Sequence, residues 1–310
     1  MTPILLSCIQ FIVIATLAPL ATGIVRWCKA RLQGRNGASP LQPYYAYATM
    51  LKKEMVISQT TSWVFRLAPY AVLSSAATIA ILLPLVATDS AFAQQGNFIV
   101  VTGVLALGSV CLVLGGLDPG SAFGGMGASR EMTLAALIEP SIITMFATFA
   151  IASGDSTISG MLTIAGKGLL AHPGLLLSMV AFGFVLLAEN ARYPVDNPAT
   201  HLELTMVHEA MTLEYSGPYL AMLEYASSLK LTVFAVLFAN FIVPVMLAST
   251  GSGFTEVMYA IVMTVIKLIV MMGLLALLET SIPKMRFYRM QEYMTIAFLF
   301  AFGGLVLVLS

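Results

Sequence analysis

Long apolar stretches separated by shorter polar segments set the pattern of this sequence. A helix that crosses the hydrocarbon core of a bilayer needs about 20 mostly apolar residues. Stretches of this kind predict eight transmembrane helices, at residues 3–25, 66–87, 98–117, 133–153, 173–190, 226–248, 257–279 and 293–309. The fifth is the weakest, because Gly and Pro crowd its start at 172–174. We therefore expect an all-α polytopic membrane protein with about eight transmembrane helices and long cytoplasmic loops, in which residues 1–310 form a single integral membrane domain.

The composition narrows the class of protein further. Hydrophobic residues make up 59% of the 310 residues and charged residues only 10%, and the mean hydropathy is +0.91. A soluble domain carries about 25% charged residues, and a chain of this size could not bury so much apolar surface in one water-soluble core. A soluble enzyme, a secreted domain, a nucleic-acid-binding protein and a disordered chain are therefore excluded. The lipid bilayer is the expected surrounding.

The positions of Lys and Arg orient the predicted helices. Most of the 15 basic residues lie in four connections, at about 26–65, 118–132, 189–225 and 280–292, whereas the opposite side of the membrane has only Lys167. Basic residues gather in cytoplasmic loops, so we predict that these four connections are cytoplasmic and that both termini lie on the outer side. Long ordered loops usually carry function, which places the functional face on the cytoplasmic side.

Several charged residues fall where a membrane tolerates them poorly. They are Glu139 inside the fourth predicted span, Glu189 at the end of the fifth, Glu224 and Lys230 at the start of the sixth, Lys267 in the middle of the seventh and Glu279 at its end. A lone charge at mid-membrane costs at least about 2.5–3.5 kcal/mol. Glu224 and Lys230 are six residues apart and face different sides of a helix, so each needs a partner elsewhere. Such residues suit a chain of ionisable groups that moves protons. They also suit static contacts between helices or with a neighbouring subunit.

The connection from Glu189 to Ala226 is long and acidic, and its amphipathic part begins near His201. Two interpretations are open: this segment folds back to line a cavity, or it docks a basic partner. His201 and His208 share a helix face but lie about 10.5 Å apart along it, too far for one zinc ion, and we expect no metal site. The chain has only three cysteines. An iron–sulfur cluster held by this chain alone is not expected, because such clusters usually take four thiolates.

Four strings together resemble one family. They are RNGASPLQPYYAYATMLKKE (35–54), GLDPGSAFGGMGASRE (116–131), the connection from Glu189 through LEYSG, and KMRFYRMQEY (284–293). They resemble the subunit 1 family of respiratory complex I. The resemblance is closer to its counterpart in membrane-bound group 4 [NiFe] hydrogenases, the formate hydrogenlyase subunit 4 and hydrogenase-4 component C type. It covers nearly the whole chain.

The resemblance implies a membrane-anchor and proton-path subunit of an energy-converting [NiFe]-hydrogenase-type, complex I-related complex in the cell inner (plasma) membrane. Such a subunit joins a soluble electron-transfer arm to ion-pumping antiporter-like membrane subunits. The other expected partners are the hydrogenase large and small subunits and a ferredoxin-like iron–sulfur subunit. The [NiFe] site and the iron–sulfur clusters are expected in these partners. This chain is expected to be a non-catalytic subunit that binds no cofactor.

The resemblance and the membrane-level charges together name the candidate site residues. The candidate proton-path residues are Glu139, Glu189, Glu203, Glu224, Lys230 and Lys267. The residues expected to tune their charge are Arg130, Arg192 and Asp196. The residues expected to dock the soluble arm are Arg35, Gln42, Glu54, Glu209, Glu214, Arg286 and Arg289. Desolvation can raise the pKa of a buried carboxylate so that it exchanges protons near neutral pH, whereas Arg keeps its proton and supplies a fixed countercharge.

Two alternatives stay open. One is a subunit that forms a quinone site in an NADH dehydrogenase-like complex, and the other is a purely structural membrane anchor. The family pattern LQxxxDxxKL reads LQPYYAYATML here, with Ala46 in place of the acid and Thr49 in place of the lysine. This departure disfavours a quinone site of the complex I kind. A structural anchor predicts that neutral variants of the buried charges impair assembly or stability and leave coupling unchanged.

Overall fold

The computed structural model describes residues 2–166, 172–196, 207–245, 247–249, 251–282 and 287–310. The secondary-structure elements in these ranges are α-helices and one short 3-10 helix, at Ala93–Gln95. The α-helices are α1 (Pro3–Leu32), α2 (Gln42–Leu51), α3 (Trp63–Leu82), α4 (Phe98–Leu117), α5 (Ala122–Ser153), α6 (Ile158–Gly166), α7 (Pro173–Glu189), α8 (His208–Thr212), α9 (Gly217–Ile242), α10 (Phe254–Ser281) and α11 (Phe287–Leu309).

Each of the eight predicted apolar stretches lies on a helix. Seven of these helices are long and apolar enough to cross a membrane. The eighth is α7, which has 17 residues. It coincides with the fifth predicted span, for which the sequence pattern was weakest. The all-α polytopic membrane fold is therefore confirmed.

The helix α5 is longer than the sequence predicted. Its span was expected at 133–153 after a loop over 118–132, but the helix begins at Ala122. There the Ser121 hydroxyl accepts a hydrogen bond from the Gly124 backbone N–H at 3.2 Å, which satisfies one of the free N–H groups that begin a helix. Residues 122–132 therefore belong to the helix and do not form an irregular loop; whether they lie on the cytoplasmic side stays a prediction. The long first and third connections also shorten, since α1 runs to Leu32 and α9 begins at Gly217.

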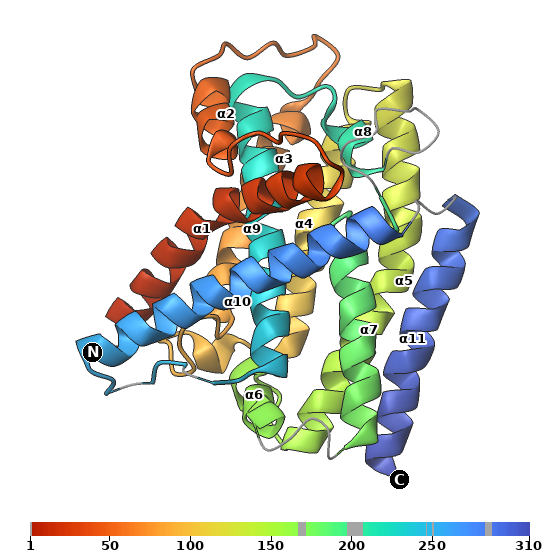
Figure 1. Cartoon of the computed structure of the whole chain (residues 1–310). Helices are drawn as coiled ribbons and strands as arrows, with labels where there is room; N and C mark the ends of the chain where they lie inside the picture. The colour runs from red at the N-terminus through yellow and green to blue at the C-terminus, as the bar shows by residue number, and fades with distance from the viewer. Residues whose placement is uncertain (1, 167–171, 197–206, 246, 250, 283–286) are drawn as a thin grey trace.

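The helix α9 lies at the centre of the molecule. In its most apolar window 72% of the residues are buried, more than in any other long apolar helix of the described chain. A helix that is apolar on all sides belongs inside a bundle. The helices α3 and α7 pack against it and run roughly side by side with α4, α5 and α11, and α1 and α10 slant across one side of α9 (Figure 1). Side chains that project from α9 can therefore meet groups from several helices.

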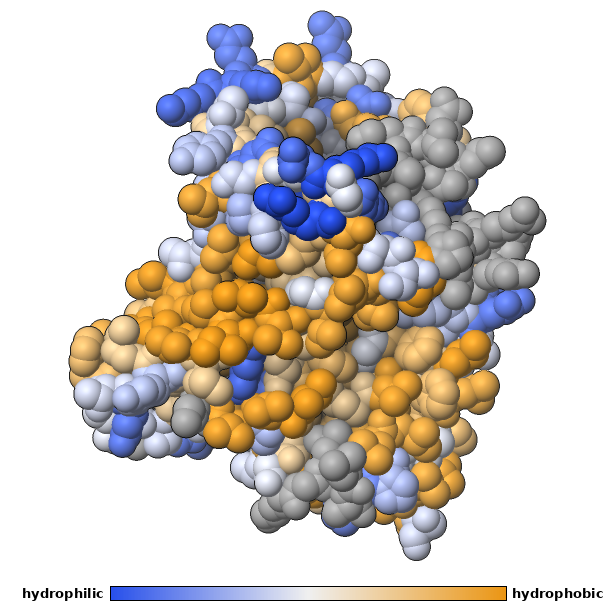
Figure 2. Space-filling view, in the orientation of Figure 1, coloured by the Kyte–Doolittle hydropathy of each residue, from blue (hydrophilic) through white to orange (hydrophobic). Residues whose placement is uncertain are grey.

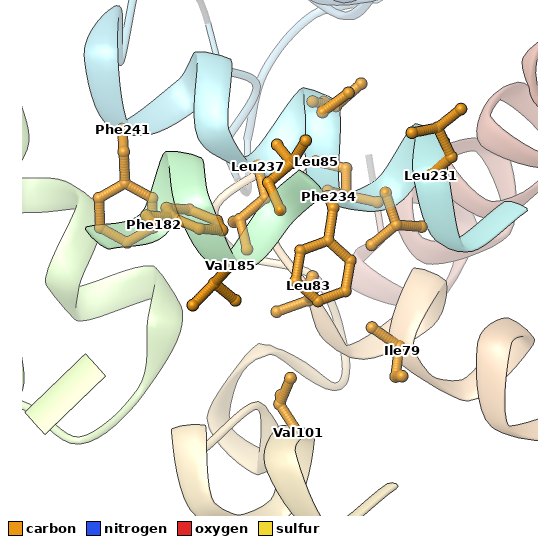
Figure 3. Packing of buried hydrophobic residues seen from close by; sticks show 14 of the residues in the cluster. Ile79, Leu83, Leu85, Val101, Phe182, Val185, Leu231, Phe234, Leu237 and Phe241 are labelled. Atoms are coloured by element: carbon orange, nitrogen blue, oxygen red, sulfur yellow. The ribbon is translucent and has the colours of Figure 1, made fainter. Parts of the chain in front are cut away.

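Aromatic packing joins α9 to α7. The Phe182 ring of α7 lies edge-on to Phe234 and Phe241 of α9, with ring centroids 6.3 and 5.9 Å apart. Val185 of α7 and Leu237 of α9 belong to the same buried cluster (Figure 3). Edge-to-face pairs of this kind contribute about 0.5–1.5 kcal/mol each beyond the area they bury. This contact sets the rotation of α7 against α9 and so positions the polar residues at the end of α7.

Most of the long connections gather at one end of the molecule, which we call the loop end. It comprises α2, residues 52–62, residues 118–121 and the described parts of residues 190–216, including α8. Both chain termini lie away from it (Figure 1). The loop end corresponds to the side that the sequence predicts to be cytoplasmic.

The segment that leads into α9 is tied to other parts of the loop end. The Val56 backbone N–H donates to the Ser216 hydroxyl at 2.9 Å. The Tyr215 ring stacks on Phe65 of α3 with centroids 4.0 Å apart, and its hydroxyl donates to the Phe65 carbonyl at 3.2 Å. These contacts join segments that lie about 150 residues apart in the sequence.

Glycines on α4 and α5 let α8 approach closely. A Cβ added to Gly116 would lie 2.9 Å from the Met211 Cβ. A Cβ added to Gly127 would lie 2.9 Å from both the Ala210 Cβ and the Val207 carbonyl oxygen. Neither position has room for a side chain, so the short helix α8 depends on glycine at both of them.

We expect Gly127→Leu to destabilise the protein by about 1–3 kcal/mol, because overpacking displaces the Val207 backbone. The matched control is Gly125→Leu in the same helix, where an added Cβ meets nothing within 4 Å. The measurement is the midpoint of thermal unfolding of the two purified variants in mild detergent. Equal midpoints would contradict the close approach of α8 to α5.

Candidate functional site

Two of the candidate proton-path residues form an ion pair beneath the loop end. The Lys230 ammonium of α9 donates to the Glu189 carboxylate at the end of α7, with Nζ 3.2 Å from Oε1. Their side chains are 20% and 9% exposed. Pairing offsets the cost of placing charges at membrane level. The two residues lie 41 positions apart in the sequence and meet because α7 packs against α9.

A third ionisable residue, Glu131 of α5, lies beside this pair. Glu131, Lys230 and His208 line one cavity of about 30 Å³ between α3, α4, α5, α8 and α9. The Ser75 and Ser227 side chains add hydroxyl groups to its wall. The rest of its wall is mostly apolar, and a cavity of this size has room for one or two water molecules, which these polar side chains could bind. Water there can carry a proton between Glu131 and Lys230.

Sequence reasoning did not single out Glu131, because the expected loop over 118–132 placed it outside the span. The signal was present in the helical register. Glu131 is four residues after Gly127 and three before Leu134, and both of these are buried on α5. Residues at such spacings share one helix face, so Glu131 is turned into the molecule.

Asp196 holds the start of α8 in place. Its Oδ2 accepts hydrogen bonds from the backbone N–H groups of Val207 and His208, each at 3.3 Å, and the residue is only 3% exposed. This contact ties the end of the segment after α7 to the start of α8. Asp196 was expected to tune the proton path through its charge, which stays a prediction; in the structure it fixes the position of His208.

The pKa of the His208 imidazole is lowered from 6.5 to about 4, mainly by burial and further by the Lys230 ammonium. The side chain is therefore neutral near pH 7. Its neutral form can accept a proton through one ring nitrogen and donate through the other.

We expect this shift to make stability depend on pH. The folded state holds fewer protons than the unfolded state between about pH 4 and 6.5, so stability falls as the pH is lowered through this window. The measurement is the unfolding midpoint from pH 7.5 to 4.5 for the wild type and for His208→Asn. The variant should lose part of the acid sensitivity. Parallel curves would show that His208 is not held neutral.

A second charge cluster joins α1, α10 and the segment after α7. The buried Glu279 carboxylate of α10 lies 2.7 Å from Lys29 Nζ and 3.5 Å from Arg192 Nη1. The Lys29 ammonium also lies over the Tyr193 ring, 5.3 Å from its centroid, a cation–π contact. Arg192, expected to tune the proton path, thus pairs with Glu279. This arrangement indicates a structural contact between distant elements.

Three other candidates lie away from the Glu189–Lys230 pair. Glu139 is half-buried, about 12 Å further along α5 than Glu131. Glu224 is exposed and lies near Arg26 of α1. Lys267 of α10 is buried and donates to Asn240 Oδ1 at 2.9 Å and to the Val245 carbonyl at 3.2 Å. Asn240 is ten residues after Lys230 on α9, about 15 Å along the helix.

The docking candidates lie mostly on the outside of the loop end. Arg35, Gln42, Glu54 and Glu214 are exposed, and Glu209 is partly buried. Arg130 is partly buried on α5. Glu203 and Arg286 lie outside the described residues, as does the side chain of Arg289. In the part of the chain that the structure describes, no three His, Cys, Asp or Glu side chains come together as a metal ion would require.

The comparisons with known proteins agree on the kind of chain. A family model described as NADH dehydrogenase matches residues 5–309. Formate hydrogenlyase subunit 4 of Escherichia coli (strain K12) is 32% identical over 310 residues, which cover 99% of each chain. Hydrogenase-4 component C of the same organism is 32% identical over 278 residues, 90% of this chain and 87% of the relative.

A solved structure has the same fold. A chain of the membrane-bound sulfane sulfur reductase (MBS), an archaeal respiratory membrane complex, superimposes with a TM-score of 0.83 over 98% of both chains. The sequence identity is 17%. At this identity the similarity shows that the two chains share a fold.

Proposed function

Since this chain belongs to the NADH dehydrogenase family that contains the subunit 1-like proteins of complex I, we propose that it is the membrane-anchor and proton-path subunit of an energy-converting complex of the [NiFe]-hydrogenase type. The chain is a membrane subunit related to those of complex I. The proposal adds that it joins a soluble electron-transfer arm to antiporter-like subunits in the cell inner membrane, with the loop end towards the cytoplasm.

The observation that carries this proposal is the group of ionisable residues beneath the loop end. Lys230 and Glu131 line one small cavity with His208, and Glu189, from a third helix, pairs with Lys230. An ion pair whose members can exchange partners through water is able to take up and release a proton when a nearby charge changes. Glu139, deeper along α5, is the next candidate carboxylate, and a proton would need water to cover the intervening 12 Å.

The loop end supports a docking role. Its outer face presents Arg35, Gln42, Glu54 and Glu214, and the Val56–Ser216 and Tyr215–Phe65 contacts hold its segments together. A surface of tied segments loses little conformational entropy on binding. We propose that it receives the hydrogenase large and small subunits and the ferredoxin-like subunit, which would hold the [NiFe] site and the iron–sulfur clusters.

A purely structural anchor is the second candidate function. The Glu279 cluster favours it, because there Lys29 and Arg192 share one buried carboxylate. The two functions are compatible if the residues around Glu131 transfer protons and the Glu279 cluster stabilises the fold. Neutral variants at Glu131 then change coupling, and neutral variants at Glu279 change stability.

The first test is a mild-detergent pull-down of the tagged full-length chain, with metal analysis and a hydrogen-evolution assay on the eluate. We expect nickel, iron and hydrogen evolution to co-purify with the chain. Partners without nickel or hydrogen evolution would overturn the hydrogenase assignment. A bound quinone in that eluate would then favour the quinone-linked alternative.

A further inference from the structure

A large apolar groove lies between α7, α9, α10 and α11. Its volume is about 620 Å³, and aliphatic, aromatic and methionine side chains form most of its wall, with Gly183, Phe238, Met271 and Ile296 among them. The helix α10 slants away from the upright α7 and α11 (Figure 1). The groove is the space that this slant leaves between α10 and the other helices.

The groove opens towards the surface that the bilayer surrounds. Val180, Leu274 and Ile296, which line it, are 45%, 50% and 45% exposed. The surface over α10 and α11 is mostly apolar in the space-filling view (Figure 2). An apolar cavity that opens sideways into a membrane is accessible to the hydrocarbon chains of lipids.

The depth of the groove is less than one leaflet. Its wall runs from Val180 to Leu187 on the upright helix α7, which is about 10 Å of helix. The hydrocarbon core is about 30 Å thick, so one leaflet is about 15 Å. A transmembrane helix of a partner would need a groove along the full thickness. The wall instead covers the half nearer the loop end, where α7 and α10 end.

The charge at the mouth of the groove indicates which lipid head group would bind there. Among the described lining residues Glu292 is the one with a charged side chain. It is exposed in the first turns of α11, near the level at which α7 and α10 end. A carboxylate at the lipid–water boundary attracts a cationic head group and repels an anionic one.

We propose that this groove is a binding site for one acyl chain of a phospholipid with a primary ammonium head group, such as phosphatidylethanolamine, in the leaflet on the loop-end side. The acyl chain fills the space between α7 and α10. The ammonium group lies against Glu292. The bound chain fills the gap between α10 and the α7–α11 pair and so supports the slanted position of α10.

The experiment uses the full-length chain in its purified complex, reconstituted in phosphatidylcholine nanodiscs. The probe is a phosphatidylethanolamine with a photoreactive diazirine in one acyl chain, and the labelled peptides are mapped by mass spectrometry. We expect labelling of the α7 and α10 walls. Unlabelled phosphatidylethanolamine should compete about two- to fivefold better than phosphatidylglycerol, as an exposed ion pair allows, and Glu292→Gln should abolish this preference.

A matched pair of variants tests the groove itself. A Cβ on Gly183 meets nothing closer than 3.7 Å, so Gly183→Leu extends into the groove, and one on Gly103 of α4 meets nothing within 4 Å. Gly183→Leu should lower the labelling by about tenfold or more, because the leucine side chain leaves too little room in the groove for an acyl chain. Gly103→Leu should leave the labelling unchanged. Equal labelling in both variants would overturn the proposal. So would displacement of the probe by an isoprenoid quinone at equal concentration, or labelling that appears only after partner subunits are removed.

Discussion

Exchanging Glu131 for Gln is expected to lower the number of protons moved per electron by at least about tenfold, while the complex still assembles. The amide keeps the shape of the side chain and cannot take up a proton. Glu131 lines the cavity with Lys230 and His208, so its loss breaks the proposed transfer at the point where three helices meet. The measurement is redox-driven proton uptake by the purified complex in proteoliposomes, with the electron-transfer rate recorded in parallel under uncoupler. This prediction rests on the proposed function.

The matched control is Glu256→Gln, since Glu256 is an exposed carboxylate in the first turn of α10, away from the loop end. It should leave the proton-to-electron ratio at the wild-type value. Wild-type coupling in Glu131→Gln would remove Glu131 from the proton path. Loss of assembly in Glu131→Gln, with normal coupling in the fraction that assembles, would favour the structural anchor instead.

Replacing Glu279 with Gln is expected to destabilise the chain by about 3 kcal/mol, because it leaves two cations without their shared carboxylate. Lys29 and Arg192 keep 18% and 14% of their side chains exposed, so water screens part of the cost. The effect should be visible as a lower midpoint of chemical unfolding in detergent. Glu214→Gln, at an exposed position of the loop end, should leave the midpoint within experimental error.

A triple variant separates charge from shape in the same cluster. Replacing Glu279, Lys29 and Arg192 with Leu, Met and Met removes all three charges together, and apolar groups of similar volume often replace a buried ion cluster at little cost. We expect it to recover most of the stability that Glu279→Gln loses. If the triple variant is as unstable as Glu279→Gln, the shape and packing of the three native side chains, and not the balance of their charges, stabilise the fold.

Part of the candidate site followed from the sequence. Glu189 and Lys230 were named because charges at membrane level demand partners, and the structure pairs them with each other. Glu224 and Lys230 were expected to find separate partners, and Glu224 lies near Arg26 while Lys230 pairs with Glu189. The rule that a charge in a membrane must be satisfied is local, so one sequence is enough to apply it.

Other parts of the site depended on contacts that no local pattern reveals. Glu131 was missed because the start of α5 depends on the Ser121 cap. Arg192 was expected to act on the proton path, and its described partner is Glu279, 87 residues away. Lys267 was grouped with the proton-path residues, and the structure binds its ammonium group to Asn240 and the Val245 carbonyl.

The sequence by itself determined the membrane class, the position of the helices and the family, because apolar length, composition and contiguous motifs are properties of nearby residues. Only the tertiary structure decided which charges meet. That choice depends on how each helix is rotated about its axis, and the rotation is set by close contacts between distant segments, such as Gly127 against Val207 and Phe182 against Phe241. A rotation of one residue, about 100° on a helix, would have turned Glu131 away from Lys230 without changing any hydropathy pattern.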